Sequence, residues 1–377
     1  MNRCYSTPVS PTATIEKPGL RGEHPLAPLL SRAPACLRMA HLPTPVERAA
    51  WLDPPHAEVW IKRDDLSSPL YGGGKVRKLE WILANPPFDD ARPVVSVGGI
   101  GSNHLVALAL FLRPLDRRLH ALVFEQPLTE HAKTNLAVMA SLGTRFWYVR
   151  DRWQLPLSWL AYQASTRVGR TEPGRSMSPG ASTPLGCFGF VMAAFEVAEQ
   201  IQAGLLPRPD TVFVTGGTGG ATAGLILGFA LAGVRTHVSS VSAVEPLLYN
   251  RAALTLKLRA VLAELTARGL PATSLTKLLR GTGVTWSIDH AQVGDRYGAP
   301  TPQGQHVIAL AAEHDVSLDP TYTAKCAAAL RASERRGPVL FWHTHGSQDL
   351  GRHVADDWRE RLPARLRQAL RRWEARD

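Results

Sequence analysis

The sequence is poor in cysteine and has no long apolar run, and both absences narrow the class of protein. Its four cysteines, Cys4, Cys36, Cys187 and Cys326, are scattered and form no Cys-x-x-Cys pair. This spacing is not typical of a disulfide framework or a cysteine-based metal site, so we expect a reducing compartment, the cytoplasm. No apolar run reaches the roughly 18 residues that a membrane-spanning helix needs, so we expect no membrane association.

The first residues lack the apolar segment of a secretory signal. Positions 1–24 are rich in Ser, Thr, Pro and Arg. We predict residues 1–35 to be a partly disordered leader, with a transit peptide as the alternative.

Acidic residues are too few to balance the basic ones: 43 Lys and Arg oppose 32 Asp and Glu, a net charge of +11. Such an excess is found in nucleic-acid-binding proteins. Here it consists mostly of arginines spread through segments that look folded, and no helix-turn-helix, zinc-finger or RRM pattern accompanies it. We therefore expect a solvated Arg-rich surface and no nucleic-acid partner. The alternative is a basic binder that keeps an inactive enzyme fold.

What is present is a regular alternation of apolar strands and helical periodicity, which is typical of parallel sheets with crossover helices. The sequence predicts strands at 58–65, 94–97, 119–124, 145–149, 211–214, 238–244 and 338–342. It predicts helices at 105–112, 129–142, 188–203, 225–232, 250–268, 300–314 and 323–333. The fold class is therefore α/β.

Three glycines, Gly72 to Gly74, precede Lys75 at the start of a helical pattern with Leu79, Ile82 and Leu83 at apolar spacing. Glycine permits backbone angles and close approaches that a side chain forbids. A lysine at a helix N-terminus lies beside unpaired N–H groups and the positive end of the helix dipole. Both favour a neutral amine, which can form a Schiff base. Taken alone, the motif also fits a basic surface helix start.

A second glycine-rich turn, Thr215-Gly216-Gly217-Thr218-Gly219-Gly220-Ala221-Thr222, follows the strand at 211–214 and opens a helix. Converging N–H groups and the helix dipole make such a turn an anion site. It has neither the GK[ST] of a P-loop nor a complete Gly-x-Gly-x-x-Gly. It therefore suits one phosphate, and a purely structural glycine turn is the alternative.

A third turn, Ser102-Asn103-His104, follows the strand at 94–97. Ligands of parallel α/β sheets bind at the carboxyl ends of the strands. A phosphate site, a glycine-delivered lysine and polar groups for a carboxylate or ring hydroxyl together indicate pyridoxal 5'-phosphate (PLP). Histidines 104, 343 and 345 have no carboxylate or cysteine partners at ligand spacing, so we predict no metal site.

At this point the chain resembles a known family. It is similar to the fold-type II PLP enzymes, in the group that contains 1-aminocyclopropane-1-carboxylate (ACC) deaminase and D-cysteine desulfhydrase. The matching motifs occur in family order across roughly residues 35–350: 41–45 (HLPTP), 61–65 (IKRDD), 72–80 (GGGKVRKLE), 96–104 (SVGGIGSNH), 215–225, 297–298 (YG), 318–322 (LDPTY) and 343–344 (HT).

The resemblance implies two domains, each an open, mostly parallel twisted sheet flanked by helices, with the cofactor in the cleft between them. We expect a large PLP-binding domain from residues 36–77 and 188–377, and a small domain from 78–187. It also implies a small amino-acid substrate and a homodimer.

By the same resemblance, Lys75 is the Schiff-base lysine and Ser102 binds the substrate carboxylate and acts in catalysis. Tyr297 and Tyr322 are catalytic tyrosines that also contact substrate. The remaining cofactor contacts are Asn103 at the ring oxygen, the phosphate residues Thr215, Gly216, Gly217, Thr218, Gly219, Gly220 and Thr222, and Thr344. His104 and Thr323, with Asn103, complete the expected substrate contacts. Without the family, Tyr297 and Tyr322 read as packing tyrosines.

Two positions distinguish members of this group. ACC deaminases have Glu where this chain has Thr323 and Leu where it has Thr344, whereas desulfhydrases have Ser or Thr at both. A carboxylate beside the pyridine nitrogen strengthens the electron sink, and a threonine gives a weaker one. We therefore predict β-elimination from a D-amino acid such as D-cysteine, giving pyruvate, ammonia and sulfide.

The alternatives are ACC ring opening and a related β-eliminase, β-replacement enzyme or racemase. The chain also departs from the family: Gly74 replaces an Asn and His345 replaces a Gly. A histidine there narrows the pocket or adds a proton donor.

Overall fold

The computed structural model describes residues 18–21, 26–295 and 297–375. They form two compact units. Unit 1 comprises residues 90–177 and 349–375 with Pro18, and unit 2 comprises the described residues of 19–89 and 178–348. Cys4 lies outside the described residues; Cys36, Cys187 and Cys326 are buried and free.

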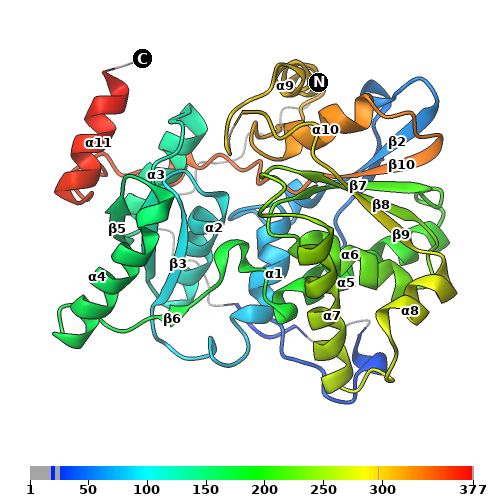
Figure 1. The fold of residues 1–377 in the computed structure, drawn as a ribbon, viewed down its shortest axis with the longest axis horizontal. Helices are drawn as coiled ribbons and strands as arrows, with labels where there is room; N and C mark the ends of the chain where they lie inside the picture. Colours follow the sequence, from blue (N-terminus) through cyan, green and yellow to red (C-terminus); the bar gives the residue numbers. More distant parts are fainter. Residues whose placement is uncertain (1–17, 22–25, 296, 376–377) are drawn as a thin grey trace. The chain divides into compact units, whose positions relative to one another are not determined.

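Unit 2 is built on a six-stranded sheet in the order β1-β2-β10-β7-β8-β9 (Figure 1). All pairs are parallel except β1 with β2. The strands are β1 (Val46–Arg48), β2 (Ala57–Lys62), β7 (Thr211–Gly216), β8 (His237–Ser242), β9 (Thr285–Asp289) and β10 (Gly337–Trp342). The helices are α1 (Gly74–Ile82), α5 (Pro184–Gln202), α6 (Gly220–Leu231), α7 (Arg251–Ala267), α8 (Leu275–Thr282), α9 (Pro302–Ala312) and α10 (Thr323–Arg331).

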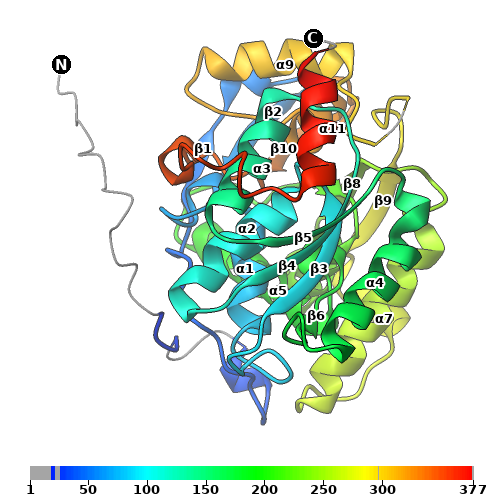
Figure 2. The same cartoon turned by 90° about the vertical axis from the view of Figure 1, so that its left-hand side faces the viewer.

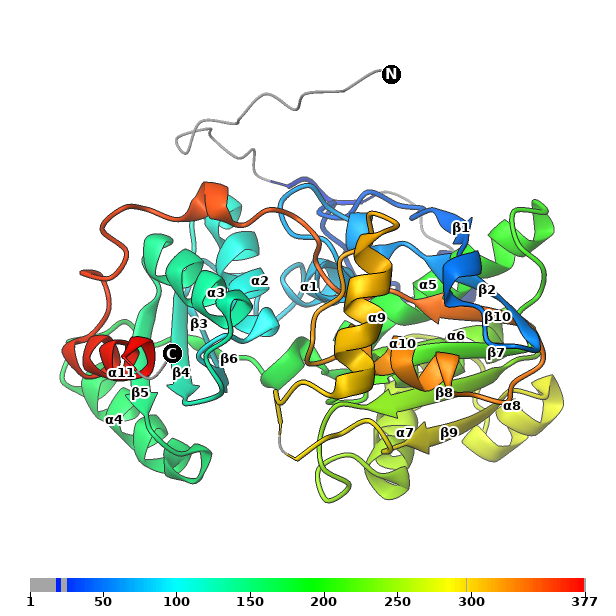
Figure 3. The same cartoon turned by 90° about the horizontal axis from the view of Figure 1, so that it is seen from above.

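The two faces of this sheet bury separate cores because side chains alternate along a strand. Val212 and Val214 of β7 pack with α5, α6 and α7, whereas Phe213 packs with α9 and α10. Figure 3 shows α9 and α10 side by side over the sheet. The helix α5 is long and apolar enough to cross a membrane, but most of it is buried in the first core, as expected for a core helix.

Unit 1 has a four-stranded parallel sheet in the order β5-β4-β3-β6 (Figure 2). The strands are β3 (Val94–Gly99), β4 (Leu119–Phe124), β5 (Arg145–Val149) and β6 (Arg175–Ser176). The helices are α2 (Asn103–Leu112), α3 (Glu130–Ser141), α4 (Leu155–Arg167) and α11 (Ala364–Glu374).

Short 3-10 turns occur in both units: η1 (Ala27–Leu29), η2 (Ala50–Leu52), η3 (Asp64–Leu66), η4 (Arg113–Leu115), η5 (Arg152–Gln154), η6 (Pro179–Ala181) and η7 (Gly351–His353).

The α/β class and the mostly parallel sheets predicted from the sequence are confirmed. The unit boundaries differ from the expected domains. All of α1 belongs to unit 2, because a Cβ on Gly189 of α5 would lie 1.9 Å from the Arg77 carbonyl oxygen. Residues 349–375, which were expected in the large domain, belong to unit 1, where Arg361 donates to the Ser141 carbonyl oxygen at 2.8 Å.

Residues 1–17 of the predicted leader lie outside the described residues. Its later part is folded: Leu26 and Leu30 are buried in the core of unit 2. Sequence patterns missed β1, β6, α4, α8, β9 and α11. The two-residue β6 lies outside all of the predicted strands.

Candidate active site

The glycine turn before α1 is wedged between two other segments of unit 2. Gly73 is the N-cap residue, with φ of 90°, a conformation that disfavours side chains. A Cβ there would lie 2.4 Å from the Thr344 carbonyl oxygen, and one on Gly72 would lie 1.7 Å from the carbonyl oxygen of Asp65. Gly74 donates its N–H to the Thr344 carbonyl oxygen at 3.1 Å. This packing fixes the first turn of α1, which carries Lys75.

Lys75 is half-buried in this first turn. Burial lowers the pKa of its ammonium, and the carboxylate of Asp319 opposes that shift only in part. A lowered pKa increases the fraction of neutral amine near neutral pH. The side chain therefore has the property that a nucleophilic lysine needs.

Gly74, where the family has Asn, has a packing explanation. A Cβ at this position would lie 2.7 Å from the ring of Phe190 on α5 and 3.4 Å from the methyl group of Thr344. The Phe190 ring thus takes the space that a side chain at position 74 would need.

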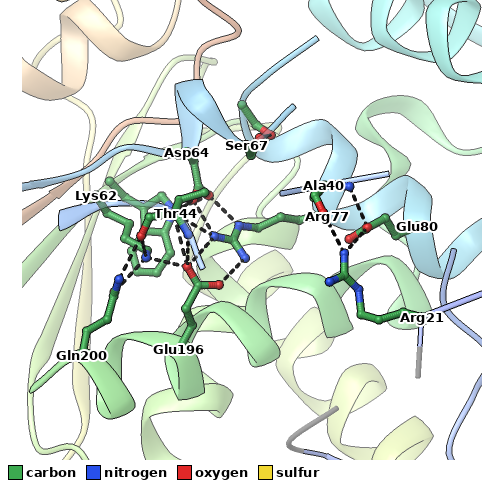
Figure 4. A network of polar contacts seen from close by, with 12 residues as sticks. Arg21, Ala40, Thr44, Lys62, Asp64, Ser67, Arg77, Glu80, Glu196 and Gln200 are labelled. Atoms are coloured by element: carbon green, nitrogen blue, oxygen red, sulfur yellow. Dashed lines mark hydrogen bonds and ion pairs between the residues drawn. The ribbon is translucent and has the colours of Figure 1, made fainter. Parts of the chain in front are cut away.

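Behind the turn lies a buried network of ion pairs (Figure 4). The Arg77 guanidinium donates two hydrogen bonds to Asp64, at 2.7 and 2.8 Å, and two to Glu196, at 2.9 and 3.2 Å. Lys62 donates to Glu196 at 2.5 Å, and the Trp342 indole to Asp64 at 2.7 Å. Burial would raise the pKa of Glu196, but Arg77 and Lys62 hold it at about 2.

Lys78, one helical turn beyond Lys75, lies in a different environment. Its ammonium donates to the Gly180 carbonyl oxygen at 3.1 Å and to the Ser182 hydroxyl at 2.9 Å. Burial, and then the nearby cations Lys75 and Lys257, lower the pKa of Lys78 to about 7. An anion placed beside this group of cations would be strongly stabilised.

The second glycine turn opens toward Lys78. Gly219, the N-cap of α6, has φ of 74°. A Cβ on Gly220 would lie 2.5 Å from the Ser182 hydroxyl and 2.8 Å from the Lys78 ammonium. The Thr218 and Ser182 hydroxyls are 2.5 Å apart. The helix N-terminus, these two hydroxyls and the Lys78 ammonium therefore lie close together.

Two predicted members of this turn are engaged elsewhere. The Thr222 hydroxyl is fully buried and 2.8 Å from the Ser240 hydroxyl, which in turn contacts Tyr249. A Cβ on Gly216 would lie 2.4 Å from the Tyr249 ring. These contacts support the turn from behind. Thr215 and Gly216 are the last two residues of β7, and Gly217 is the first residue after this strand.

Tyr297 and Tyr322 form a pair, with hydroxyl oxygens 2.7 Å apart and rings at 70°. Burial raises the pKa of both phenols. A Cβ on Gly217 would lie 3.3 Å from the Tyr322 ring, so the pair borders the second glycine turn. Both phenols therefore stay protonated near neutral pH, and each hydroxyl can donate a hydrogen bond.

Asp319 begins α10. Its carboxylate accepts from the N–H groups of Thr321, Tyr322 and Thr323. The Thr323 hydroxyl donates to the same carboxylate at 2.8 Å and accepts from the Asp319 N–H at 2.9 Å. Thr323 is fully buried, so its hydroxyl is committed to this helix start. Its expected substrate contact stays a prediction.

The loop after β10 carries Thr344 and His345. Thr344 is half-buried against Gly74, as described above. His345 is buried, and its Nδ1 lies 3.9 Å from the Asp319 carboxylate. The structure thus brings Lys75, Thr344 and both tyrosines into one part of unit 2.

In unit 1, Ser102 is the N-cap of α2 and accepts from the Leu105 N–H at 3.4 Å. Asn103 begins that helix, and its Oδ1 lies 2.6 Å from His131 Nε2. His104 is buried, with Nε2 2.9 Å from the Ser96 hydroxyl of β3. Since Ser96 donates to the Met177 carbonyl oxygen, His104 donates to Ser96. This bond fixes the ring on β3, and a substrate contact of His104 stays a prediction.

Sequence reasoning missed Lys78, Ser182 and Asp319. Lys78 carried a signal, because residues three apart on a helix share a face and Lys75 was already a candidate. Asp319 precedes a proline in a matched motif, but nothing in its spacing indicated that it faces the tyrosines. Ser182 lies in an irregular segment, and only the fold brings it to Lys78.

Comparison with known proteins identifies the family. A family model described as "pyridoxal-phosphate dependent enzyme" matches residues 37–344. The chain belongs to this family. It is 31% identical to nocardicin C-9' epimerase of Nocardia uniformis subsp. tsuyamanensis over 299 residues, 78% of this chain and 88% of the relative. It is 30% identical to D-cysteine desulfhydrase of Salmonella paratyphi A over 336 residues, 85% of this chain and 96% of the relative.

Solved structures agree on the fold. A crystal structure of an ACC deaminase homologue covers 90% of this chain and all of its own, with a TM-score of 0.70 and 23% identity. Threonine deaminase isoform 2 of Solanum lycopersicum covers 83% of this chain and 86% of its own, with a TM-score of 0.53 and 16% identity. At these identities the likeness concerns the fold alone. The predicted family, fold and PLP cofactor are confirmed.

The residues present fit this cofactor. A phosphate dianion needs cations and N–H donors, which Lys78 and the start of α6 supply. An aldehyde needs an amine with a lowered pKa, which Lys75 supplies. Within the described part of the chain, no group of three or more His, Cys, Asp or Glu side chains is arranged to hold a metal ion.

Proposed function

We propose that the protein is a PLP-dependent lyase that eliminates the β-substituent of a small D-amino acid, as D-cysteine desulfhydrase does. The observation that carries the proposal is the arrangement on α1: Lys75 and Lys78 lie one turn apart, and Lys78 faces the glycine turn of α6. One helix therefore supplies both an amine for the aldehyde and a cation for the phosphate.

When bound, the cofactor supplies an aldehyde for the substrate amine and a ring that accepts the electron pair left by the α-proton. Lys75 would hold the aldehyde and, once the substrate amine has displaced it, its amine of lowered pKa would accept the α-proton at Nζ. Lys78, Thr218 and Ser182 would hold the phosphate and so would fix the ring relative to Lys75.

The tyrosine pair is suited to the second half of the reaction. Burial keeps both phenols protonated near neutral pH, so one of them would donate a proton to the departing sulfur. The hydroxyl of the other, 2.7 Å away, would then donate a hydrogen bond to the phenolate oxygen that is left. Ser102 would bind the substrate carboxylate, and Asn103 the ring oxygen of the cofactor. The family resemblance supports these last two roles. It also supports a homodimer in the cytoplasm.

Elimination rather than ACC ring opening is favoured by position 323. ACC deaminases have a glutamate there, whereas the hydroxyl of Thr323 is bonded within its own helix start. Such a site adds no carboxylate to protonate the ring nitrogen. A weaker electron sink is sufficient when the leaving group is a thiolate.

A second candidate is epimerisation at the α-carbon. The observation that favours it is the 31% identity to nocardicin C-9' epimerase. Epimerisation needs a proton acceptor and a proton donor on opposite faces of the α-carbon. Lys75 and the tyrosine pair, or Ser102, are the groups available for it.

The test begins with the purified protein, which should absorb visible light when loaded with PLP. Lys75→Ala should remove the visible band, and retention of a borohydride-reducible cofactor in this variant would contradict the assignment of Lys75. D- and L-amino acids and ACC are then assayed separately. Pyruvate with sulfide from D-cysteine supports elimination, and 2-oxobutyrate from ACC supports ring opening. Incorporation of solvent deuterium at the α-carbon with inversion and no keto acid supports epimerisation.

A further inference from the structure

The start of α3 packs directly on the turn that carries Asn103. A Cβ on Gly101 would lie 2.4 Å from the Cβ of Ala132, so α3 contacts the turn as closely as a glycine allows. His131 and Asn135 lie one helical turn apart on α3, and both form hydrogen bonds with the Asn103 side chain. All of these residues belong to unit 1.

The hydrogen-bond roles in this cluster follow from one backbone carbonyl. Asn135 Nδ2 lies 2.9 Å from the Gly101 carbonyl oxygen. Because a carbonyl oxygen only accepts, the group of Asn135 that faces it is the NH₂ group. The same Nδ2 donates to Asn103 Oδ1 at 2.9 Å. Asn103 therefore turns its oxygen toward α3, and its own NH₂ group faces away from α3.

His131 completes the arrangement. Its Nε2 lies 2.6 Å from Asn103 Oδ1, and at this distance a proton must lie between the two atoms. His131 Nε2–H is thus a donor. It lies 3.2 Å from Asn135 Nδ2, because both groups donate to the same acceptor, Asn103 Oδ1. This donor is present in the imidazolium and in the Nε2–H neutral form, so the interaction does not depend on the charge of His131.

We propose that His131 is a positioning residue for the cofactor, acting through Asn103. By donating to Oδ1, it holds the Asn103 amide in one orientation and polarises it, so that the amide N–H is a stronger donor to the cofactor's ring oxygen. The inference rests on the proposed function, because it takes Asn103 as the ring-oxygen contact. His131 belongs to none of the family motifs recognised in the sequence.

The proposal has a spectroscopic consequence. A donor on the ring oxygen competes with the proton that this oxygen shares with the nitrogen of the lysine–cofactor linkage. Weakening the donor strengthens that sharing and raises the pH at which the linkage loses its proton. We expect the midpoint of the pH-dependent change in the visible band to rise by about half a unit or more in His131→Leu.

The experiment compares His131→Leu, His131→Gln and His306→Leu, each loaded with PLP and titrated by absorbance. Gln keeps an N–H donor and should restore most of the wild-type midpoint. His306 is an exposed histidine on α9 of unit 2 and should leave the midpoint unchanged. A wild-type midpoint in folded His131→Leu would overturn the proposal, as would equal shifts in the Leu and Gln variants.

A second measurement needs no cofactor and covers the case in which His131→Leu folds poorly. The chain has only five asparagines, so selective ¹⁵N labelling gives few side-chain amide signals, and Asn103→Asp identifies that of residue 103. In cofactor-free His131→Ala, this signal should move and exchange faster with solvent, whereas that of Asn85 should stay. An unmoved Asn103 signal overturns the proposal. A wild-type protein without any visible band would instead refute the proposed function.

Discussion

Arg77 and Lys78 are neighbours on α1, and both are buried, yet their surroundings are opposite. Arg77 is paired with the carboxylates of Asp64 and Glu196. The pKa of Lys78 is lowered by burial and by two other lysines. A buried charge with hydrogen-bonded counter-charges stabilises the fold. Cations that surround a buried lysine raise the free energy of the protein when no anion is bound. The first arrangement fixes the turn, and the second is suited to a ligand.

The largest effect expected from breaking this contrast comes from Arg77→Met. It leaves two buried carboxylates without their main partner and should lower the free energy of unfolding by about 3–5 kcal/mol. Urea unfolding followed by circular dichroism measures the loss. The matched control is Arg48→Met, whose pairing with Asp53 is partly exposed and should contribute less than about 1 kcal/mol. Equal losses of stability in the two variants would show that the buried Arg77 network contributes no more than the partly exposed Arg48–Asp53 pair.

Lys78→Gln should weaken cofactor binding and leave the stability of the cofactor-free protein intact, in contrast to Arg77→Met. It removes the cation that we propose as a phosphate contact and should weaken PLP binding about 10- to 100-fold, since a hydrogen bond to a charged group contributes about 1.5–3 kcal/mol. The cofactor-free protein should be no less stable than wild type, because a buried cation is lost. Cofactor titration and thermal unfolding measure the two quantities. Lys277→Gln, at an exposed lysine of α8, is the control.

Gly74→Asn tests whether Phe190 explains the departure from the family. The added side chain must displace the Phe190 ring, and overpacking of this kind costs about 1–3 kcal/mol. The loss should be smaller when the same change is made in a Phe190→Leu background. Identical losses in both backgrounds, measured by urea unfolding, would show that the two positions are not coupled.

The smallest and most specific effect is a pH dependence with two separate branches, one acid and one alkaline, and stability rises with pH in both. The pKa of Glu196 is lowered from 4.5 to about 2, so its stabilisation is complete above about pH 4.5 and is lost as the pH falls toward 2. The pKa of Lys78 is lowered from 10.5 to about 7, so the unfolded chain binds more protons between these values. The cofactor-free protein should therefore gain stability as the pH rises from 7 toward 10.5. Glu196→Gln should flatten the acid branch only, and Lys78→Gln the alkaline branch only.

Much of this protein was predictable from local patterns. Strands such as 94–97 and 211–214, and the glycine turns after them, follow from alternation and from residues that permit special backbone angles. The cofactor followed from motif order, which also predicted the lysine and the two tyrosines as site residues. The short strand β6 and the fold of residues 26–35 were not predictable, because few of their own residues determine their conformation and packing partners far along the chain do.

The sequence by itself determined the α/β class, the family and the candidate nucleophile, because each is encoded by residues close together in the chain. Only the tertiary structure decided that Arg77 is neutralised by a carboxylate 119 positions away, and that Lys78 meets a hydroxyl 104 positions away. Charge environment depends on distance in space, and a local pattern does not contain that distance.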